Sequence, residues 1–302
     1  MSHTALPRTL APGLHRLGSY NLACFLVETA ETALLFETGM SLLAPLILAQ
    51  LDELGVPREK IRWVVHSHAH SDHSTGQAAL LGALPRAGLL LSPASLKHLS
   101  KPSTAEGFAD EDHFTRRRLE ELGMLPGGPL PQPLPLVPQR HRTVEPGEVL
   151  DLGGLNLELR SAAGHAPGGL LAWLPELGAF LASDSAGFHM AARPNYPLYF
   201  TGYHEYQQTL AEILRLQPEL LCLGHQGWFR GDEARRYLEA LSAHLAFEHA
   251  GIRRRHRRGE DEDSLARRLM ERYYHDELAI YPRDVLWYCC RLLVRRSLEA
   301  DD

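Results

Sequence analysis

Short apolar runs separated by turns set the strongest limit on what the first hundred residues can fold into. Residues 14–37 contain three such runs, "LHRLG", "NLACFLVET" and "TALLFETG", whose length and β-rich composition indicate an antiparallel meander. A helical pattern at residues 41–55 follows, and then strand, helix, strand and helix alternate up to residue 100. Such alternation is typical of layered proteins, so we predict an α/β fold.

The middle of the chain continues this pattern after an interruption. A charged helix is expected at residues 108–122, and the six prolines of residues 125–139 then exclude both a helix and a central strand. We interpret the proline-rich segment as an extended surface connector, with a lid near the site as the alternative. The β pattern returns at residues 155–187, and a helix and a strand are expected at residues 203–216 and 219–225.

The last seventy residues differ in character, because their apolar spacing is helical throughout. Helices are expected at residues 232–251, 264–278 and 282–300, with Asp232 and Ser264 as N-caps of the first two. The sequence therefore predicts two domains, a catalytic domain of residues 1–231 and an all-helical extension of residues 232–302. Between the first two of these helices, "RRRHRRGEDED" is interpreted as a solvated loop whose charges offset one another, with a phosphate-contacting patch as the alternative.

Bulk properties limit the class of protein and of partner. The net charge of -6 provides no overall attraction to nucleic acid or to an acidic membrane face. The first residues lack the apolar core of a secretion signal, and no apolar run approaches the length of about 20 residues that spans a bilayer. The four cysteines are scattered in apolar surroundings, which is typical of free thiols. We expect a cytoplasmic enzyme whose partner is neither nucleic acid nor a membrane.

The segment "VVHSHAHSDHSTG" contains the densest group of metal-binding side chains. It places four histidines and one aspartate within eight residues, directly after a predicted strand. Three single residues recur downstream, each where an apolar run ends among small residues: His165, Asp184 and His225. Because loops at strand ends are where α/β proteins gather their chemistry, these residues are candidates for one shared site.

The spacing within the segment is suited to two ions. His68 and His70 are two residues apart, so in an extended chain both imidazoles project to the same side. Asp72 and His73 follow where the chain turns into a helix, and adjacent residues diverge there, so this pair can face a second position. Imidazoles and carboxylates without a thiolate suit zinc, iron or manganese, with Zn²⁺ preferred and Fe²⁺ or Mn²⁺ as alternatives.

The whole series, H-x-H-x-D-H followed by G-H, S-D and G-H, resembles the metallo-β-lactamase-fold hydrolases. This resemblance implies an αββα four-layer sandwich followed by the helical extension. It also implies that His68, His70 and His165 hold one metal ion, that Asp72, His73 and His225 hold another, and that Asp184 bridges the two.

Three neighbouring residues are expected to support the ligands without binding metal. Glu37, in "FETG", occupies the place that the family usually gives to a supporting aspartate. Ser67 is where the family usually has a small hydroxyl residue. His66 lies outside the six-residue motif, and we expect it to end the strand and hold the loop rather than to bind an ion.

Two ions about 3.5–4 Å apart can share a hydroxide and lower its pKa towards neutrality. Such a site predicts hydrolysis, with the hydroxide attacking a carbonyl or phosphoryl group and with Asp72 as the catalytic residue that orients the hydroxide. The expected substrate is a small-molecule ester or thioester, with an acyl-coenzyme A thioester preferred. A lactonase, a glyoxalase-II-like enzyme and a small-molecule phosphodiesterase are the alternatives, and a metal-containing regulatory protein that acts through its extension is a further one.

Within the superfamily, the chain resembles the aminobenzoylacetyl-coenzyme A thioesterases that also act as quorum-sensing effectors, on the basis of its length, its "ETG" sequence and its helical extension. Either these helices cap the site or they form the face of a homodimer. Aromatic residues after the bridging aspartate are candidates for the substrate pocket, with ordinary packing as the alternative. These candidates are Phe188, His189, Tyr196, Tyr199, Tyr203 and His204.

Overall fold

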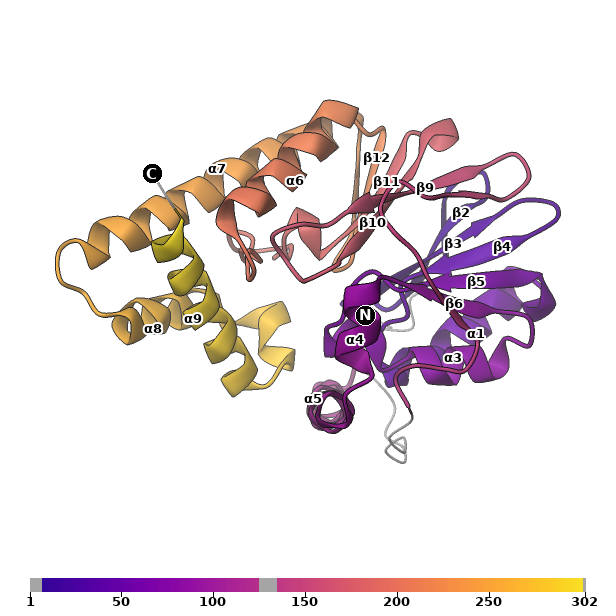
Figure 1. Ribbon diagram of the computed structural model, residues 1–302, viewed down its shortest axis with the longest axis horizontal. Helices are drawn as coiled ribbons and strands as arrows, with labels where there is room; N and C mark the ends of the chain where they lie inside the picture. Colours follow the sequence, from indigo (N-terminus) through magenta and orange to yellow (C-terminus); the bar gives the residue numbers. More distant parts are fainter. Residues whose placement is uncertain (1–6, 125–134, 301–302) are drawn as a thin grey trace.

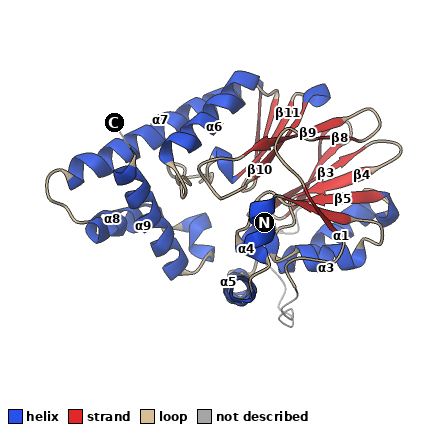
Figure 2. Cartoon of the chain, viewed as in Figure 1, coloured by secondary structure: helices blue, strands red, loops and turns tan. Residues whose placement is uncertain are grey.

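A computed structural model describes residues 7–124 and 135–300 of the chain. Two β-sheets face each other, and helices cover the outer face of each sheet (Figures 1 and 2). The predicted αββα sandwich with C-terminal helices is therefore confirmed. Most of the proline-rich connector, residues 125–134, lies outside the described residues.

The first sheet has seven strands in sequence order, from β1 at one edge to β7 at the other. The first four strands pair antiparallel, as the meander predicted, and β4 to β7 pair parallel because helices connect them. The strands are β1 (Arg8–Ala11), β2 (Leu14–Gly18), β3 (Ala23–Glu28), β4 (Ala33–Phe36), β5 (Ile61–Val65), β6 (Gly88–Leu91) and β7 (His141–Thr143).

The second sheet has six strands in the order β13-β12-β11-β10-β9-β8. Its neighbours pair antiparallel except for β11 and β12, which are parallel because helix α6 (Tyr203–Leu216) lies between them in the chain. The strands are β8 (Val149–Asp151), β9 (Asn156–Ser161), β10 (Leu170–Leu174), β11 (Ala179–Ser183), β12 (Leu220–Leu223) and β13 (Trp228–Arg230).

The central core lies between the two sheets. Phe25, Phe36 and Val65 of the first sheet pack against Leu159 and Leu181 of the second, and all of them are buried. Packing of the two inner faces brings the strand ends of both sheets to common edges of the sandwich. One such edge is where the candidate site lies.

Helices on the outer face of the first sheet form a second core with β3 to β6. Helix α5 starts six residues before the predicted residue 108, because Pro102 occupies its first turn, where the missing N–H of proline costs no hydrogen bond. These helices are α1 (Ala44–Glu53), α2 (Ser71–Ser74), α3 (Gln77–Ala83), α4 (Pro93–Leu99) and α5 (Pro102–Glu121).

The C-terminal residues form α7 (Gly231–His256), α8 (Glu262–Tyr273) and α9 (Arg283–Glu299), with the 3₁₀ helix η5 (Asp276–Ile280) before α9. Helix α7 runs beside α6, and α8 and α9 fold back towards the sandwich (Figure 1). None of the helices in the described ranges combines the length and apolar character that a membrane crossing needs.

Both predicted N-caps of the extension are wrong. Helix α7 already begins at Gly231, so Asp232 lies inside its first turn. Helix α8 is capped by Asp261, whose carboxylate accepts the backbone N–H of Ser264 at 2.9 Å. The acidic end of "RRRHRRGEDED" therefore begins a helix, because a carboxylate at the N-cap satisfies an otherwise unpaired donor.

The extension shares one continuous core with the second sheet. A single cluster of buried residues includes Leu223 of β12, Leu210 of α6, Leu238 of α7 and Leu293 of α9. The start of α7 coincides with the predicted boundary at residue 231. The division into two independent domains stays a prediction, because this shared core joins the two parts.

Candidate metal centre

The sequence motifs meet at one edge of the sandwich because each of them follows a strand. His68 and His70 lie just after β5, and His165 lies in the loop that follows β9. Asp184 directly follows β11, and His225 comes two residues after β12. Residues up to 157 positions apart in the chain, His68 and His225, thus reach the same place.

Three histidines form the first group of potential ligands. Nε2 of His68 lies 3.0 Å from Nδ1 of His70, and Nε2 of His165 lies 3.1 Å from each of these nitrogens. Together with Asp184 they offer ligand atoms that all lie within 4.8 Å of one another.

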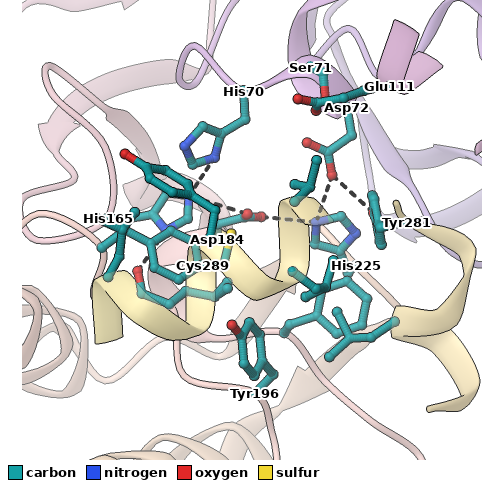
Figure 3. Close-up of a pocket in the computed structure, with 18 of the residues that line it drawn as sticks. His70, Ser71, Asp72, Glu111, His165, Asp184, Tyr196, His225, Tyr281 and Cys289 are labelled. Atoms are coloured by element: carbon teal, nitrogen blue, oxygen red, sulfur yellow. Dashed lines mark hydrogen bonds and ion pairs between the residues drawn. The ribbon is translucent and has the colours of Figure 1, made fainter. Parts of the chain in front are cut away.

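Asp72, His73 and His225 form the second group, and Asp184 lies between the groups (Figure 3). Oδ1 of Asp184 is 3.3 Å from Nε2 of His73 and 3.2 Å from Nε2 of His225. Its other oxygen, Oδ2, is 3.4 Å from Nε2 of His165. Each carboxylate oxygen of Asp184 therefore faces a different group, which is the arrangement that a bridging ligand requires.

These residues fit a pair of divalent ions. Nε2 of His73 and Oδ1 of Asp184 are buried and have no hydrogen-bond partner, although buried polar atoms are nearly always paired. Ligands of a tetrahedral zinc ion with bonds of about 2.1 Å lie about 3.4 Å apart. The spacings between neighbouring ligand atoms of the groups run from 3.0 to 3.8 Å and so lie on both sides of that value. An ion between these atoms would satisfy both of them.

Glu37 supports both groups from behind. Its Oε2 accepts hydrogen bonds from Nδ1 of His73 and from Oγ of Ser67, each at 2.9 Å, and its Oε1 accepts from Oγ of Ser183 at 2.5 Å. Ser67 in turn accepts from Nδ1 of His68 at 3.0 Å. We infer from these partners that Nδ1 of both histidines carries a proton, so that Nε2 of each ring faces the site.

Backbone carbonyls orient two further histidines in the same way. Nδ1 of His165 donates to the carbonyl of Leu198, and Nδ1 of His225 donates to the carbonyl of Asn21, both at 2.8 Å. His66 belongs to neither group, and its Nε2 lies 2.9 Å from Oγ of Ser74 in α2. That contact joins the residue after β5 to α2, and the loop-holding role of His66 stays a prediction.

Burial and charge act in opposite directions on the pKa values of the site. Burial lowers the pKa of His68 well below its ordinary value and that of His70 to about 3, which leaves their lone pairs free. Burial also lowers the pKa of His73, but the carboxylates of Glu37, Asp184 and Asp72 outweigh it and leave that pKa well above the ordinary value. For Asp184 burial is likewise outweighed, because His73 and His225 hold the pKa of this carboxyl well below its usual range.

The backbone is strained beside the ligands. Glu37, Ser183 and Gln226 have positive φ angles of 79°, 45° and 49°, which side-chain-bearing residues rarely adopt. Such conformations cost on the order of 1–3 kcal/mol each and persist where the surroundings enforce them. At Gly224, a Cβ would lie 2.9 Å from Oδ1 of Asp184, so the close approach of this backbone to the site requires glycine.

Comparisons with known proteins agree with this geometry. The family model of the Metallo-beta-lactamase superfamily matches residues 20–225, which include all the ligand candidates. The chain belongs to the metallo-beta-lactamase superfamily. Members of this superfamily are metal-dependent hydrolases that typically bind two metal ions, and the two groups of His and Asp side chains match that expectation.

Solved structures share the fold at low sequence identity. A HARLDQ-motif mutant of the metallo-beta-lactamase from Cronobacter sakazakii is 22% identical, with a TM-score of 0.61 over 82% of this chain and 98% of that one. A subclass B3 metallo-beta-lactamase from a soil metagenome library is also 22% identical, with a TM-score of 0.58 over 83% of this chain and 99% of that one.

The stereoselective inverting sec-alkylsulfatase Pisa1 from Pseudomonas sp. is similar over a longer part of this chain. It is 18% identical, with a TM-score of 0.66 over 98% of this chain and 50% of that one. The match covers nearly all of this chain, so it includes most of the helical extension as well as the sandwich.

A cavity of about 400 Å³ opens beside the two ligand groups of this superfamily member. Helix α9 forms one wall through Val285, Cys289, Leu292 and Arg296, whose spacing of three and four residues places them on one face of the helix. Tyr288 also lines the cavity and is 62% exposed, so the mouth of the cavity reaches the surface at this residue.

Two of the six predicted pocket residues, Phe188 and Tyr196, line this cavity. The other four do not line it: Tyr199 is buried, Tyr203 and His189 are half-buried, and His204 is exposed. The hydroxyl of Tyr199 lies 3.0 Å from Oγ of Ser297, and the ring of Tyr203 stacks on His249 with the centroids 3.7 Å apart. His189 contacts Asn195, Phe229 and Tyr237, and His204 contacts the ring of Tyr203.

Tyr281 and Glu111 are two of the polar cavity residues that sequence reasoning missed. Tyr281, between η5 and α9, donates a hydrogen bond of 3.0 Å to Oδ2 of Asp72 (Figure 3). Glu111 of α5 accepts a hydrogen bond of 2.5 Å from Oγ of Ser71, and burial raises the pKa of its carboxyl. Glu111 lies in a charged amphipathic helix and Tyr281 in a helical extension, so neither had a local pattern that distinguished it.

Proposed function

We propose that this protein is a dinuclear metal-dependent hydrolase that acts on a carbonyl ester or thioester. The observation that carries the proposal is the junction of the two ligand groups with one largely apolar cavity. Zn²⁺ is the proposed metal, with Fe²⁺ and Mn²⁺ as alternatives, because nitrogen and carboxylate ligands suit all three ions. His68, His70 and His165 would hold one ion, Asp72, His73 and His225 the other, and Asp184 both.

Two bound ions supply a water-derived nucleophile at neutral pH and polarise the substrate oxygen. The residues of the chain do the rest. Asp184 keeps the two positions together through its separate oxygens. Asp72 lies at the cavity wall, where its carboxylate can orient a nucleophile as well as bind metal. Hydrogen bonds from behind fix the tautomers of four of the five histidines, so little reorganisation is needed during the reaction.

A cysteine nucleophile is the chemical alternative, since Cys289 lines the same cavity. Burial raises the pKa of the Cys289 thiol far above neutrality, chiefly because the surroundings of α9 exclude water. The thiolate is the reactive form, so a protonated Cys289 is a wall residue and not a nucleophile. This supports hydrolysis through the metal centre.

The charges around the cavity favour a neutral carbonyl over a phosphodiester. Glu111 and Asp72 line the cavity at its metal end, and neither carboxylate can pair with a phosphate oxygen as a lysine or arginine would. Among the described lining residues, Arg296 carries the cationic side chain, and it is paired with Glu299. The remaining wall, which includes Phe188, Leu198, Phe200 and Leu286, suits an apolar or aromatic acyl group.

A thioester is the preferred substrate, because the departing thiolate is stable and the acyl group alone can occupy the cavity. About 400 Å³ lies at the lower end of the range for small-molecule pockets, so a large carrier such as coenzyme A would remain outside. The resemblance to aminobenzoylacetyl-coenzyme A thioesterases supports an aromatic acyl thioester in particular. A role as a regulatory protein is less well supported, because one side of α9 forms a wall of the cavity.

The proposal is tested by substrate turnover. Zinc-loaded and metal-stripped protein would be assayed on matched panels of aromatic and aliphatic thioesters, aryl esters, lactones, phosphodiesters and alkyl sulfates. We expect turnover of thioesters or esters by the loaded protein, loss on chelation and recovery on zinc addition. Preferential turnover of phosphodiesters or alkyl sulfates would contradict the proposed substrate class. No turnover of any class, combined with capture of a partner through the extension, would support the regulatory role instead.

A further inference from the structure

The hydroxyl of Tyr281 reaches the metal centre from the helical extension. It lies 3.0 Å from Oδ2 of Asp72, although the two residues are 209 positions apart in the chain. The same oxygen lies 3.7 Å from Nε2 of His73 and 3.7 Å from Nε2 of His225. Tyr281 therefore contacts the oxygen that faces the second group of ligands, and not the far oxygen of the carboxylate.

Asp72 differs from the other ligand candidates in where its support originates. The histidines whose Nδ1 donates a hydrogen bond, such as His73, His165 and His225, donate it to the sandwich or to the loop beside it. The carboxylate of Asp72 accepts one hydrogen bond from the described residues, and this bond comes from Tyr281. Asp72 lies in α2, which has four residues, so the short helix alone does little to fix its side chain.

The surroundings of Tyr281 hold the phenol in this position. Its ring packs edge-on against Phe188, with the centroids 6.2 Å apart, and its backbone carbonyl accepts a hydrogen bond of 3.0 Å from Tyr274. The preceding residue, Ile280, is buried in the core on the outer face of the first sheet. The segment that leads into α9 is thus anchored on the outer side of the first sheet. The C-terminal helices pack instead on the outer side of the second sheet.

A hydrogen bond to a ligating carboxylate fixes the orientation of the ligand. Removing such a partner typically lowers metal affinity 10- to 100-fold. Because Tyr281 belongs to the extension, the effect also runs in the other direction. An ion held by Asp72 requires the orientation that Tyr281 imposes, so binding of the ion favours the docked extension by the same free energy.

We propose, on the basis of the proposed metal centre, that Tyr281 is a positioning residue for the ion position formed by Asp72, His73 and His225. Tyr281 completes this position and couples ion binding there to docking of the extension. The coupling makes the second position dependent on a segment outside the sandwich. The first position, which consists of His68, His70 and His165, has no such dependence, because Tyr281 contacts none of these three residues in the described structure.

The test compares Tyr281→Phe with Tyr199→Phe. Both substitutions remove one phenolic oxygen that joins the extension to the rest of the protein, but Tyr199 contacts Ser297 of α9 and no ligand. Zinc would be titrated into each metal-stripped protein in competition with a chromophoric chelator. We expect Tyr281→Phe to bind one of two zinc ions 10- to 100-fold more weakly and the other with unchanged affinity. Tyr199→Phe is expected to bind both ions as the wild type does.

Hydrogen exchange of residues 274–289 gives a second measurement that does not depend on activity. Zinc is expected to increase the protection of this segment in the wild type and in Tyr199→Phe, and to have a smaller effect in Tyr281→Phe. Equal weakening of both ions, or unchanged affinity for both in Tyr281→Phe, would overturn the proposal while leaving the metal centre intact. A wild-type protein that binds no zinc would instead overturn the proposed function, and this inference with it.

Discussion

Nδ1 of His73 lies 2.9 Å from Oε2 of Glu37, and both side chains are almost fully buried. The same oxygen accepts the hydroxyl of Ser67, which contacts His68 of the other ligand group. One carboxylate thus orients a histidine on each side of the centre. The extra methylene of Glu37, relative to the aspartate usual at this place, is accommodated with a left-handed backbone, at φ of 79°.

Replacing Glu37 with Gln should weaken metal binding at both positions, because the amide keeps the shape and removes the charge that holds His73 and Ser67. We expect zinc affinity to fall about 10- to 100-fold in a chelator competition. Glu28→Gln is the matched control, since Glu28 also contacts a histidine, His15, at 3.1 Å but lies away from the centre. Equal losses in both variants would show that Glu37 acts on overall stability and not on the ligands.

Replacing Asp184 with Asn should remove the bridge between the two groups. An amide offers one neutral oxygen where the carboxylate offers Oδ1 to His73 and His225 and Oδ2 to His165. We expect fewer than two zinc ions per chain by elemental analysis, and a fall in hydrolysis of about 10³-fold or more, equivalent to about 4 kcal/mol. The exposed Asp151→Asn variant should retain both ions. Two tightly bound ions in Asp184→Asn would contradict the bridging role.

Acid should destabilise the metal-free protein through His66. Burial, with help from the nearby His73 and His70, lowers the pKa of His66 from 6.5 to about 3 in the folded state. Between these values the unfolded chain binds the extra proton, so the free energy of unfolding falls as pH drops from 6.5 towards 3. One such proton corresponds to a slope of about 1.4 kcal/mol per pH unit.

His66→Gln should reduce that slope, because glutamine can still contact Ser74 but does not titrate. The measurement is urea unfolding of the metal-free wild type and variant at several pH values between about 4.5 and 7.5. This range spans the pKa of an ordinary histidine, about 6.5. The variant is expected to be less stable at pH 7.5 and to lose less stability on acidification. Parallel curves for the two proteins would refute the role of His66.

Shortening Leu292 should change which acyl groups are accepted. Leu292 lines the cavity from α9, so Leu292→Ala opens space for two or three additional methylenes. Each buried methylene contributes about 0.8 kcal/mol, so the ratio of kcat/KM for longer over shorter acyl chains should rise roughly fourfold per carbon. Leu298→Ala, also on α9 but outside the lining, should leave the ratio unchanged. An unchanged ratio in Leu292→Ala would show that acyl groups bind elsewhere.

Strands, helices and ligand candidates could be predicted because their signals are local. The runs that became β2 to β5 show their periodicity within a few residues, and His165, Asp184 and His225 each follow such a run. The joint order of the motifs then indicated one site. Helix boundaries were less certain, as at α5 and α8, because a proline or aspartate near the end decides them.

The substrate cavity could not be predicted in the same way. Side chains in residues 188–204 turn either to the cavity, as Phe188 does, or to the extension, as Tyr199 does. That choice depends on where α9 packs, which no local pattern contains. The role of Tyr281 could not be predicted for the same reason, because its contact with Asp72 joins residues more than two hundred positions apart in the chain.

One side of helix α9 packs in the protein core, and another side lines the cavity. Leu293 and Val294 are fully buried in the shared core, whereas Val285, Cys289 and Leu292 are half-buried, line the cavity and belong to neither ligand group. Exchanges at these three wall positions would alter the shape offered to a substrate without replacing a fully buried core residue or a ligand candidate. Substitutions along one side of α9 can therefore change the substrate preference of this protein while the candidate metal ligands stay the same.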